Sequence, residues 1–324
     1  MKRIIWVFFF TLVAFQLSAK KFYHIESPDK MLSLKVHITD KVEYTVSHGE
    51  DTVLEKSPVS MSLTDGTGFG VNPVLRKAEI KTVKEYIDAP IYKKKVVADI
   101  YNGLLLKFRG DYALEFRVYD GVAYRFISEK KVSFCVQNEQ AVFNFPKQSK
   151  AYVAYVRENG YHADNRGNKG TFEEQFFKSF VNTYSYMNLS DWNPKRLAFM
   201  PLLVELGHGK KVCLTEADLL NYPGMYLNNS GDSDTLEGVF APYPRTVKQG
   251  GVENMQEVVL TRENYIAKCE GRTNFPWRTL IVSVKDAELA NSDMVYRLST
   301  PNQLGDLSWI KPGKAAWEWW NSCS

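Results

Sequence analysis

The sequence predicts an all-β protein built as an antiparallel sandwich. Apolar side chains alternate with polar ones in many short segments, a pattern typical of strands that bury one face. Aromatic residues make up 14% of the 324 residues, which suits a sheet protein. Turn residues such as Asp120-Gly121 separate the segments at intervals of about ten residues, as in β-sandwich domains.

The alternation is clearest in the first half of the chain, where six strands are predicted at residues 32–38, 42–46, 104–108, 112–118, 122–126 and 132–136. Helical periodicity is hard to find before residue 280, and residues 173–181 are the best short candidate. Residues 221–251 are rich in Asn, Gly, Pro, Asp and Ser, so we expect loop for much of their length. A long structured loop is often functional, although a crossover between sheets is an alternative.

Residues 1–19 are predicted to be a secretory signal peptide. Lys2 and Arg3 supply the positive start, Ile4 to Phe15 is apolar, and Ala19 ends a stretch suited to cleavage. The apolar run of about a dozen residues is short for a bilayer span, which disfavours an uncleaved anchor. We therefore expect an exported protein that does not contact the membrane after cleavage.

Cysteine spacing and charge exclude several classes of protein. Cys135, Cys213, Cys269 and Cys323 show no CxxC spacing, so neither a zinc site nor a dithiol motif is predicted. One disulfide or unpaired thiols both remain open. The net charge is only +4, and the longest basic run, Lys93-Lys94-Lys95, is expected to be a solvated turn or strand edge. No nucleic-acid partner is therefore expected.

Three segments together carry a family resemblance. The first is FRVYDGVAYRF at 116–126 and the second is LTEADLLNYPGMYL at 214–227. The third is GRTNFPWR at 271–278, which is followed by WIKPGK at 309–314. Their order resembles the amino-terminal half of glycoside hydrolase family 97, which contains periplasmic α-glucosidases and α-galactosidases. The resemblance covers nearly the whole chain after the signal peptide. Arg117 and Arg125 flank the turn of the first segment, and we expect structural ion pairs or carbonyl caps there rather than substrate contacts.

The resemblance implies a large antiparallel β-super-sandwich of the galactose-mutarotase-like kind, followed by a catalytic (β/α)8 barrel. Residues 20–300 would form the sandwich, and residues 301–324 a linker and the first strand of a truncated barrel. Glycoside hydrolysis needs two carboxyl groups beside the scissile bond. In the family these groups lie on later barrel strands, so no catalytic residue is expected in this chain, and the isolated chain is expected to be inactive.

The resemblance also implies a calcium ion that is bound by carboxylates from both domains. Glu216, in the segment Thr-Glu-Ala-Asp-Leu, is the position that matches the sandwich ligand. Calcium takes about six to eight oxygen ligands, so one glutamate cannot hold the ion and the barrel must complete its shell. Asp218 is a second candidate, although we expect it to point away if the segment is extended.

The last ten residues hold three tryptophans within four positions. In an extended strand, Trp317 and Trp319 share one face with Asn321, and Trp320 lies on the other. Because the carboxyl ends of barrel strands face the substrate, Trp319, Trp320 and Asn321 are predicted substrate contacts. Glu318 alternates to the face of Trp320 and is not predicted to be the catalytic acid.

Two functions remain open at this point. The resemblance favours the amino-terminal portion of a periplasmic glycoside hydrolase that acts on α-glucosides or α-galactosides, with an oligosaccharide and calcium as its ligands. The alternative is a non-catalytic carbohydrate-binding or interaction sandwich. The sequence carries no signal for an oligomeric state.

Overall fold

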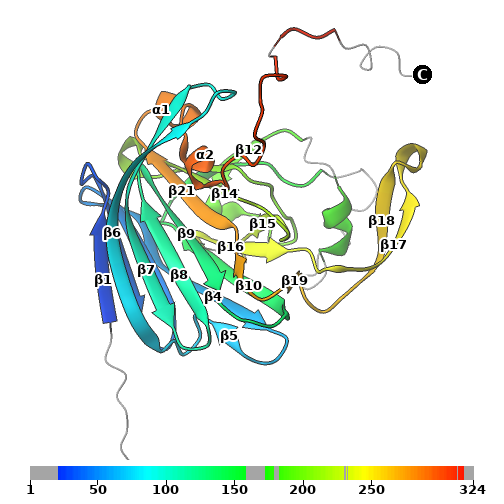
Figure 1. Cartoon of the computed structure of the whole chain (residues 1–324), viewed down its shortest axis with the longest axis horizontal. Helices are drawn as coiled ribbons and strands as arrows, with labels where there is room; N and C mark the ends of the chain where they lie inside the picture. Colours follow the sequence, from blue (N-terminus) through cyan, green and yellow to red (C-terminus); the bar gives the residue numbers. More distant parts are fainter. Residues whose placement is uncertain are drawn as a thin grey trace, which may run out of the picture.

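Two antiparallel sheets face each other across one shared core in the computed structural model (Figure 1). The structure describes residues 21–157, 172–178, 182–229, 231, 233–311 and 313–316. The predicted signal peptide and the predicted substrate contacts Trp319, Trp320 and Asn321 lie outside the described residues. The all-β sandwich prediction is confirmed.

The first sheet is a nine-stranded antiparallel sheet whose main path starts at the amino-terminal strand. Short strands β5 and β19 pair with β4 and β10 beside this path. The strands of the main path, in spatial order, are β1 (Lys21–Glu26), β2 (Leu32–Ile38), β3 (Val42–His48), β4 (Asp51–Leu63), β10 (Phe134–Asn144), β16 (Thr235–Phe240) and β15 (Met225–Asn228), and the two short strands are β5 (Gly68–Phe69) and β19 (Ala267–Cys269).

The second sheet has ten strands and brings the middle and the end of the chain together. Its last strand in the sequence, β21, lies between β14 and β9. In spatial order the strands are β12 (Ser185–Asn188), β11 (Lys150–Val153), β13 (Leu202–Glu205), β14 (Lys211–Ala217), β21 (Trp277–Ser283), β9 (Gly121–Ser128), β8 (Tyr112–Val118), β7 (Val96–Phe108) and β6 (Leu75–Asp88), with β20 (Thr273–Asn274) paired to β9.

A separate hairpin of β17 (Pro244–Gly250) and β18 (Gln256–Arg262) projects from the sandwich (Figure 1). The remaining regular elements are short: 3-10 turns at Glu173–Phe177, Leu189–Asp191, Gly207–Gly209 and Val252–Asn254, and helices α1 (Asp286–Ala290) and α2 (Met294–Leu298). No helix in the described ranges has the length and apolar character needed to cross a bilayer.

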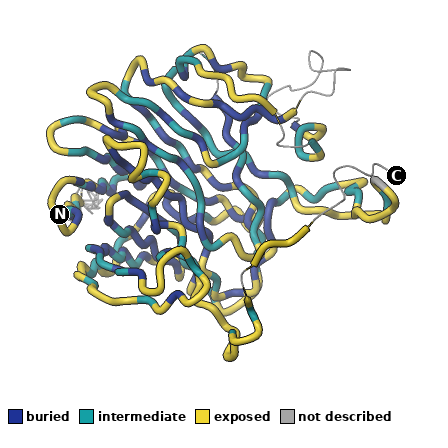
Figure 2. Tube along the Cα trace, turned by 90° about the horizontal axis from the view of Figure 1, so that it is seen from above, coloured by how far each residue is buried: buried dark blue, intermediate teal, exposed yellow. Residues whose placement is uncertain are grey.

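The core lies between the sheets because each sheet turns one set of alternating side chains inward. In β2, Leu32, Leu34, Val36 and Ile38 are buried, whereas the residues between them are not. Figure 2 shows the same alternation of buried and less buried positions along the strands. Strand β21 differs because all seven of its residues are buried. Its outer face is covered by α1 and α2, which contact it in the folded chain.

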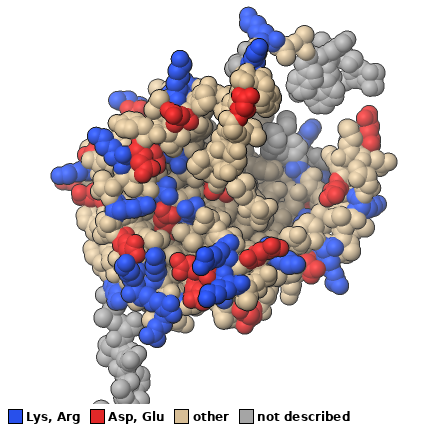
Figure 3. All heavy atoms as spheres, in the orientation of Figure 1, with Lys and Arg blue, Asp and Glu red and all other residues tan. Residues whose placement is uncertain are grey.

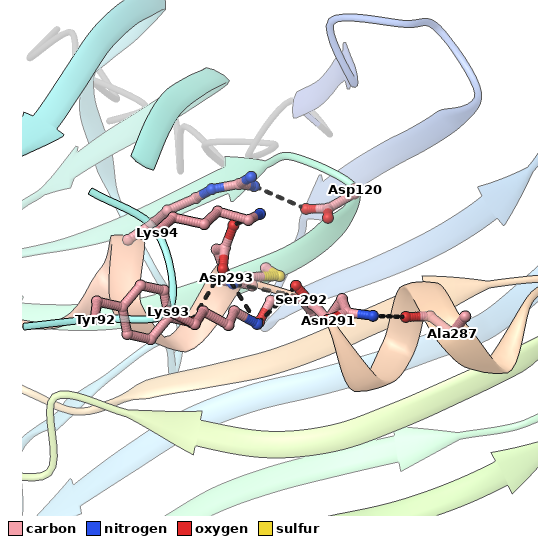
Figure 4. Close-up of polar contacts among 10 residues, drawn as sticks. Tyr92, Lys93, Lys94, Asp120, Ala287, Asn291, Ser292 and Asp293 are labelled. Atoms are coloured by element: carbon pink, nitrogen blue, oxygen red, sulfur yellow. Dashed lines mark hydrogen bonds and ion pairs between the residues drawn. The ribbon is translucent and has the colours of Figure 1, made fainter. Parts of the chain in front are cut away.

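The turn between β6 and β7 is fastened to the start of α2 by a buried carboxylate. Asp293 is 3% exposed; it accepts a hydrogen bond from the Tyr92 hydroxyl at 3.0 Å and pairs with Lys93 at 3.3 Å and with Lys94 (Figure 4). Burial alone would raise the pKa of Asp293, but hydrogen bonds from Lys94, Tyr92 and Lys93 outweigh it and hold the pKa below its ordinary value. The basic run therefore lies in a turn, as predicted, and anchors α2. Elsewhere on the face shown in Figure 3, both signs of charge are interspersed.

Most of the predicted strands are confirmed, and three expectations are wrong in part. Val132 is 71% exposed and precedes β10, which begins at Phe134. The segment 221–251 is not mainly loop: it holds β15, β16 and β17, because its turn residues gather at the corners between short paired strands. The helix expected from residue 173 is a 3-10 turn over Glu173–Phe177.

The end of the described chain shows no barrel strand. Residues 301–311 and 313–316 contain no regular element, and Trp309 is 69% exposed. The predicted first barrel strand is thus not evident in the part of the chain that the structure describes.

The described cysteines carry free thiols. Cys135, Cys213 and Cys269 form no disulfide, and Cys323 lies outside the described residues. Burial raises the pKa of the Cys213 and Cys269 thiols to about 11, so both are poor nucleophiles near neutral pH.

Candidate functional site

Glu216, the predicted calcium ligand, lies near the end of β14 at the edge of the buried core. Its side chain is 14% exposed, and Oε2 accepts a hydrogen bond from Arg278 Nη1 at 2.7 Å. The backbone amide of Met225 lies 3.3 Å from both carboxylate oxygens. Among the described residues, Oε1 therefore has only the long amide contact, which leaves it the better placed of the two oxygens to meet a cation.

Arg278 links Glu216 to a second carboxylate on the opposite sheet. Arg278 lies on β21 and Glu139 on β10, and both side chains are at most 2% exposed. The pair is bidentate: Nε to Oε1 measures 2.9 Å and Nη2 to Oε2 measures 2.7 Å. The rings of Tyr222 and Phe240 flank the guanidinium, with centroids 5.8 and 5.1 Å from its central carbon. This ion-pair network therefore connects the two sheets through the core.

The electrostatics of the network follow from two carboxylates that share one guanidinium. Burial raises the pKa of Glu216, and Arg278 opposes that rise only in part. Burial disfavours the charge on Arg278, but Glu139 and Glu216 outweigh it and raise the pKa of Arg278. The guanidinium stays charged, and Glu216 is the member that exchanges protons most readily with solvent because it is the most exposed of the three.

The described residues around Glu216 do not form a complete metal site. No group of three or more His, Cys, Asp or Glu side chains among the described residues could hold a metal ion. Calcium prefers about six to eight oxygens, so further ligands would have to come from other residues.

Asp218 does not join Glu216. Its Oδ1 accepts a hydrogen bond from the Thr300 amide at 2.7 Å, and its Oδ2 lies 4.0 Å from Arg125 Nη1. The expectation that Asp218 points away holds, but extension is not the reason, since residues two apart in a strand share a face. Strand β14 ends at Ala217, and Asp218 turns aside with a φ of 56°.

A second ion-pair cluster occupies the outer face of the second sheet. Glu115 is 7% exposed and accepts hydrogen bonds from Arg117 Nε at 2.9 Å and Arg125 Nε at 3.0 Å. The two guanidinium groups lie over the buried ring of Trp277, 4.7 and 4.3 Å from its centroid. The prediction that Arg117 and Arg125 form structural ion pairs is confirmed.

Sequence reasoning did not assign the roles of Arg278 and Glu139. A signal was present, because Arg278 is a charged residue inside the otherwise uncharged run Trp277–Ser283. A charge in a strand that is buried on both faces requires a partner. The partner's identity could not be read from the sequence, since Glu139 is 139 positions away.

The sandwich fold and this network together define a β-sandwich domain with one accessible carboxylate at the edge of its core. The chain belongs to glycoside hydrolase family 97, because the family model described as Glycosyl-hydrolase 97 N-terminal matches residues 25–301. The resemblance seen in the sequence motifs is therefore confirmed for the amino-terminal part of the family.

Two curated relatives match most of the chain. It is 41% identical over 322 residues to a retaining alpha-galactosidase of Bacteroides thetaiotaomicron, covering 99% of this chain and 47% of that protein. It is 25% identical over 286 residues to a probable retaining alpha-galactosidase of Streptomyces bingchenggensis, covering 87% of this chain and 38% of that protein. The chain thus spans less than half the length of each relative.

Solved structures share the fold. A family 97 enzyme from Pseudoalteromonas sp. strain K8 in complex with acarbose has a TM-score of 0.70 at 21% identity, over 90% of this chain and 40% of that chain. A beta-arabinopyranosidase has a TM-score of 0.63 at 21% identity, over 81% of this chain and 40% of that chain. At these identities the likeness establishes the sandwich fold.

Changing Glu216 to glutamine is expected to alter the pH dependence of stability. The folded-state pKa of Glu216 is raised from its ordinary value of 4.5, so its stabilising contribution is complete below pH 4.5 and is lost as pH rises through the folded pKa. The free energy of unfolding of the variant minus that of the wild type should therefore increase with pH above 4.5 and then level off. Urea titrations at several pH values measure this difference, and a difference that falls with pH would show that the pKa is lowered instead.

Proposed function

We propose that this chain is the amino-terminal sandwich of an exported family 97 α-galactosidase. The observation that supports this most strongly is the 41% identity, over 99% of the chain, to a retaining alpha-galactosidase. In this proposal residues 1–19 direct export to the periplasm, residues 20–300 form the sandwich, and residues 301–324 lead into a catalytic (β/α)8 barrel. The substrate is an oligosaccharide with a terminal α-galactoside; an α-glucoside, the other substrate class of the family, is the alternative.

The catalytic carboxyl groups belong to the barrel in this proposal. A retaining glycosidase needs two accessible carboxyl groups about 5–5.5 Å apart, one of which attacks the sugar. In the sandwich, Glu139 is buried and both its oxygens accept hydrogen bonds from Arg278. Glu216 accepts a hydrogen bond from the same guanidinium. Neither is free to act as nucleophile or acid while this network holds, which supports placing the catalytic pair in the barrel.

The sandwich contributes ligands rather than catalysis. We assign to Glu216 the role of one calcium ligand: Arg278 holds Oε2, and Oε1 would be the oxygen available to the ion. Holding the carboxylate by a buried partner fixes its orientation, which strengthens a metal site that two domains share. Trp319, Trp320 and Asn321 are assigned as substrate contacts at the carboxyl end of the first barrel strand.

The test is a chimera in which this chain replaces the matching 47% of the Bacteroides thetaiotaomicron relative. The chimera should hydrolyse an aryl α-galactoside in the presence of calcium, whereas the isolated chain should show no hydrolysis. The change Glu216→Gln in the chimera should lower the affinity for calcium by about tenfold or more, measured as activity against free calcium concentration.

The matched control is Glu43→Gln, because the Glu43 side chain is also 14% exposed but pairs with Lys41. This control should leave the calcium dependence unchanged. Hydrolysis by the isolated chain would refute the assignment of catalysis to the barrel. Equal calcium dependence in the Glu216→Gln and wild-type chimeras would refute the ligand assignment.

A further inference from the structure

Exposed tyrosines gather at the β12 edge of the second sheet, which is opposite the edge formed by β6. Tyr152 on β11 and Tyr186 on β12 are directly paired across the strands, with ring centroids 4.6 Å apart. Tyr152 is 37% exposed, Tyr186 is 51% exposed, and Tyr184, which immediately precedes β12, is 64% exposed. We call these three residues the aromatic platform. Strand β12 is labelled in Figure 1.

The platform faces away from the core because of strand alternation. Ala151 and Val153, which flank Tyr152 in β11, are completely buried in the main core. Packing therefore does not require large aromatic rings at Tyr152 and Tyr186. Apolar rings that remain exposed on a sheet face are candidates for ligand contact.

A row of polar side chains runs beside the platform on the same face. Asn188 is paired with Lys150, Lys150 with Glu205, and Glu205 with Lys211 across four neighbouring strands. Glu205 Oε2 accepts a hydrogen bond from the Tyr186 hydroxyl at 2.6 Å. That bond holds the Tyr186 ring in place before any ligand arrives, which reduces the entropy lost on binding.

A groove of about 730 Å³ continues from this row. It shares Lys150 and Asn188 with the row and is otherwise lined largely by amide and hydroxyl side chains, including Asn144, Gln148, Ser190 and Thr235. Such side chains both donate and accept hydrogen bonds, as a ligand with many hydroxyl groups requires.

The charges of this surface are nearly balanced. In the row, Lys150 and Lys211 are balanced by Glu205 and by Asp286, whose Oδ1 lies 2.6 Å from Lys211 Nζ. The groove adds one lysine, Lys147, and two carboxylates, Glu55 and Asp234, so the whole surface holds three lysines against four carboxylates. A polyanion would find no surplus of positive charge here, and one excess carboxylate offers little attraction to a cationic peptide, whereas a neutral ligand needs no charge complementarity.

We propose that the aromatic platform and the adjoining groove bind a neutral oligosaccharide chain at a non-catalytic site. The C–H faces of sugar rings would stack on Tyr152 and Tyr186, while the groove side chains bond the hydroxyl groups. This site goes beyond the proposed hydrolase function. Its role is to hold a polymeric or branched substrate while hydrolysis occurs elsewhere.

Affinity electrophoresis of the full chain tests the proposal, with soluble galactomannan and pullulan as probes. The wild type should be retarded by at least one of the two polysaccharides. The double change Tyr152→Ala and Tyr186→Ala should weaken retardation about tenfold. The matched control Tyr86→Ala removes a tyrosine that is 63% exposed on the distant strand β6, and it should bind like the wild type.

Nitration of the wild type by tetranitromethane provides a second measurement that does not depend on the folding of a variant. The retarding polysaccharide should protect Tyr152 and Tyr186 from modification and leave Tyr86 as reactive as before. The proposal is overturned if neither probe retards the wild type, or if protection is equal at all three tyrosines. A dimer in solution that the double change disperses would also overturn it, by assigning the face to a second copy of the chain. Hydrolysis of a small aryl galactoside by the chimera does not need this site. Failure of the binding proposal is therefore distinguishable from failure of the proposed function.

Discussion

The change Arg278→Met is expected to lower the free energy of unfolding by about 3–5 kcal/mol, because it leaves a buried carboxylate without its partner. Glu139 is 3% exposed, and both its oxygens accept hydrogen bonds from Arg278. Without the guanidinium, Glu139 must remain charged in the core or take up a proton. Urea or guanidinium denaturation, followed by tryptophan fluorescence, measures the loss.

A second variant separates the loss of attraction from the cost of the unpaired charge. Adding Glu139→Leu to Arg278→Met replaces the pair with apolar side chains, and this should recover most of the lost stability. The control Arg245→Met removes an arginine that is 67% exposed, and it should change stability by less than about 0.5 kcal/mol. If Arg278→Met and Arg245→Met had similar effects, the inter-sheet ion pair would not be a major element of stability.

Replacing Trp277 with alanine is expected to cost about 3–5 kcal/mol, the usual loss when a large aromatic side chain is removed from a core. Trp277 is fully buried beneath the guanidinium groups of Arg117 and Arg125. The change creates a cavity under α2 and also removes the ring that both arginines cover. Thermal and chemical denaturation with circular dichroism measures the effect.

Trp309 provides the matched control, since the same ring is 69% exposed there. Trp309→Ala should change stability by no more than about 0.5 kcal/mol. Comparable losses at both positions would mean that Trp309 is buried against the sandwich in solution.

Local pattern was sufficient to predict the individual strands of the sandwich. Residues 32–38 and 112–118 alternate in polarity, and both are strands with the predicted faces buried. Composition misled at residues 221–251, because turn residues at the corners of short strands resemble those of a long loop. Motif order identified the family, and the family match confirms it over residues 25–301.

The arrangement around Glu216 could not be read in the same way. In the sequence, Glu139, Glu216 and Arg278 are three separate charges. Arg278 lies 139 positions from Glu139 and 62 positions from Glu216. Only the packing of β10 against β21 and the pairing of β14 with β21 bring them within hydrogen-bonding distance. The alternation of polarity is a local property that each strand carries alone, whereas the partner of a buried charge depends on which strands become neighbours. Which strands become neighbours depends on the burial of the whole core. The tertiary structure therefore decided that Arg278 orients the carboxylate of Glu216.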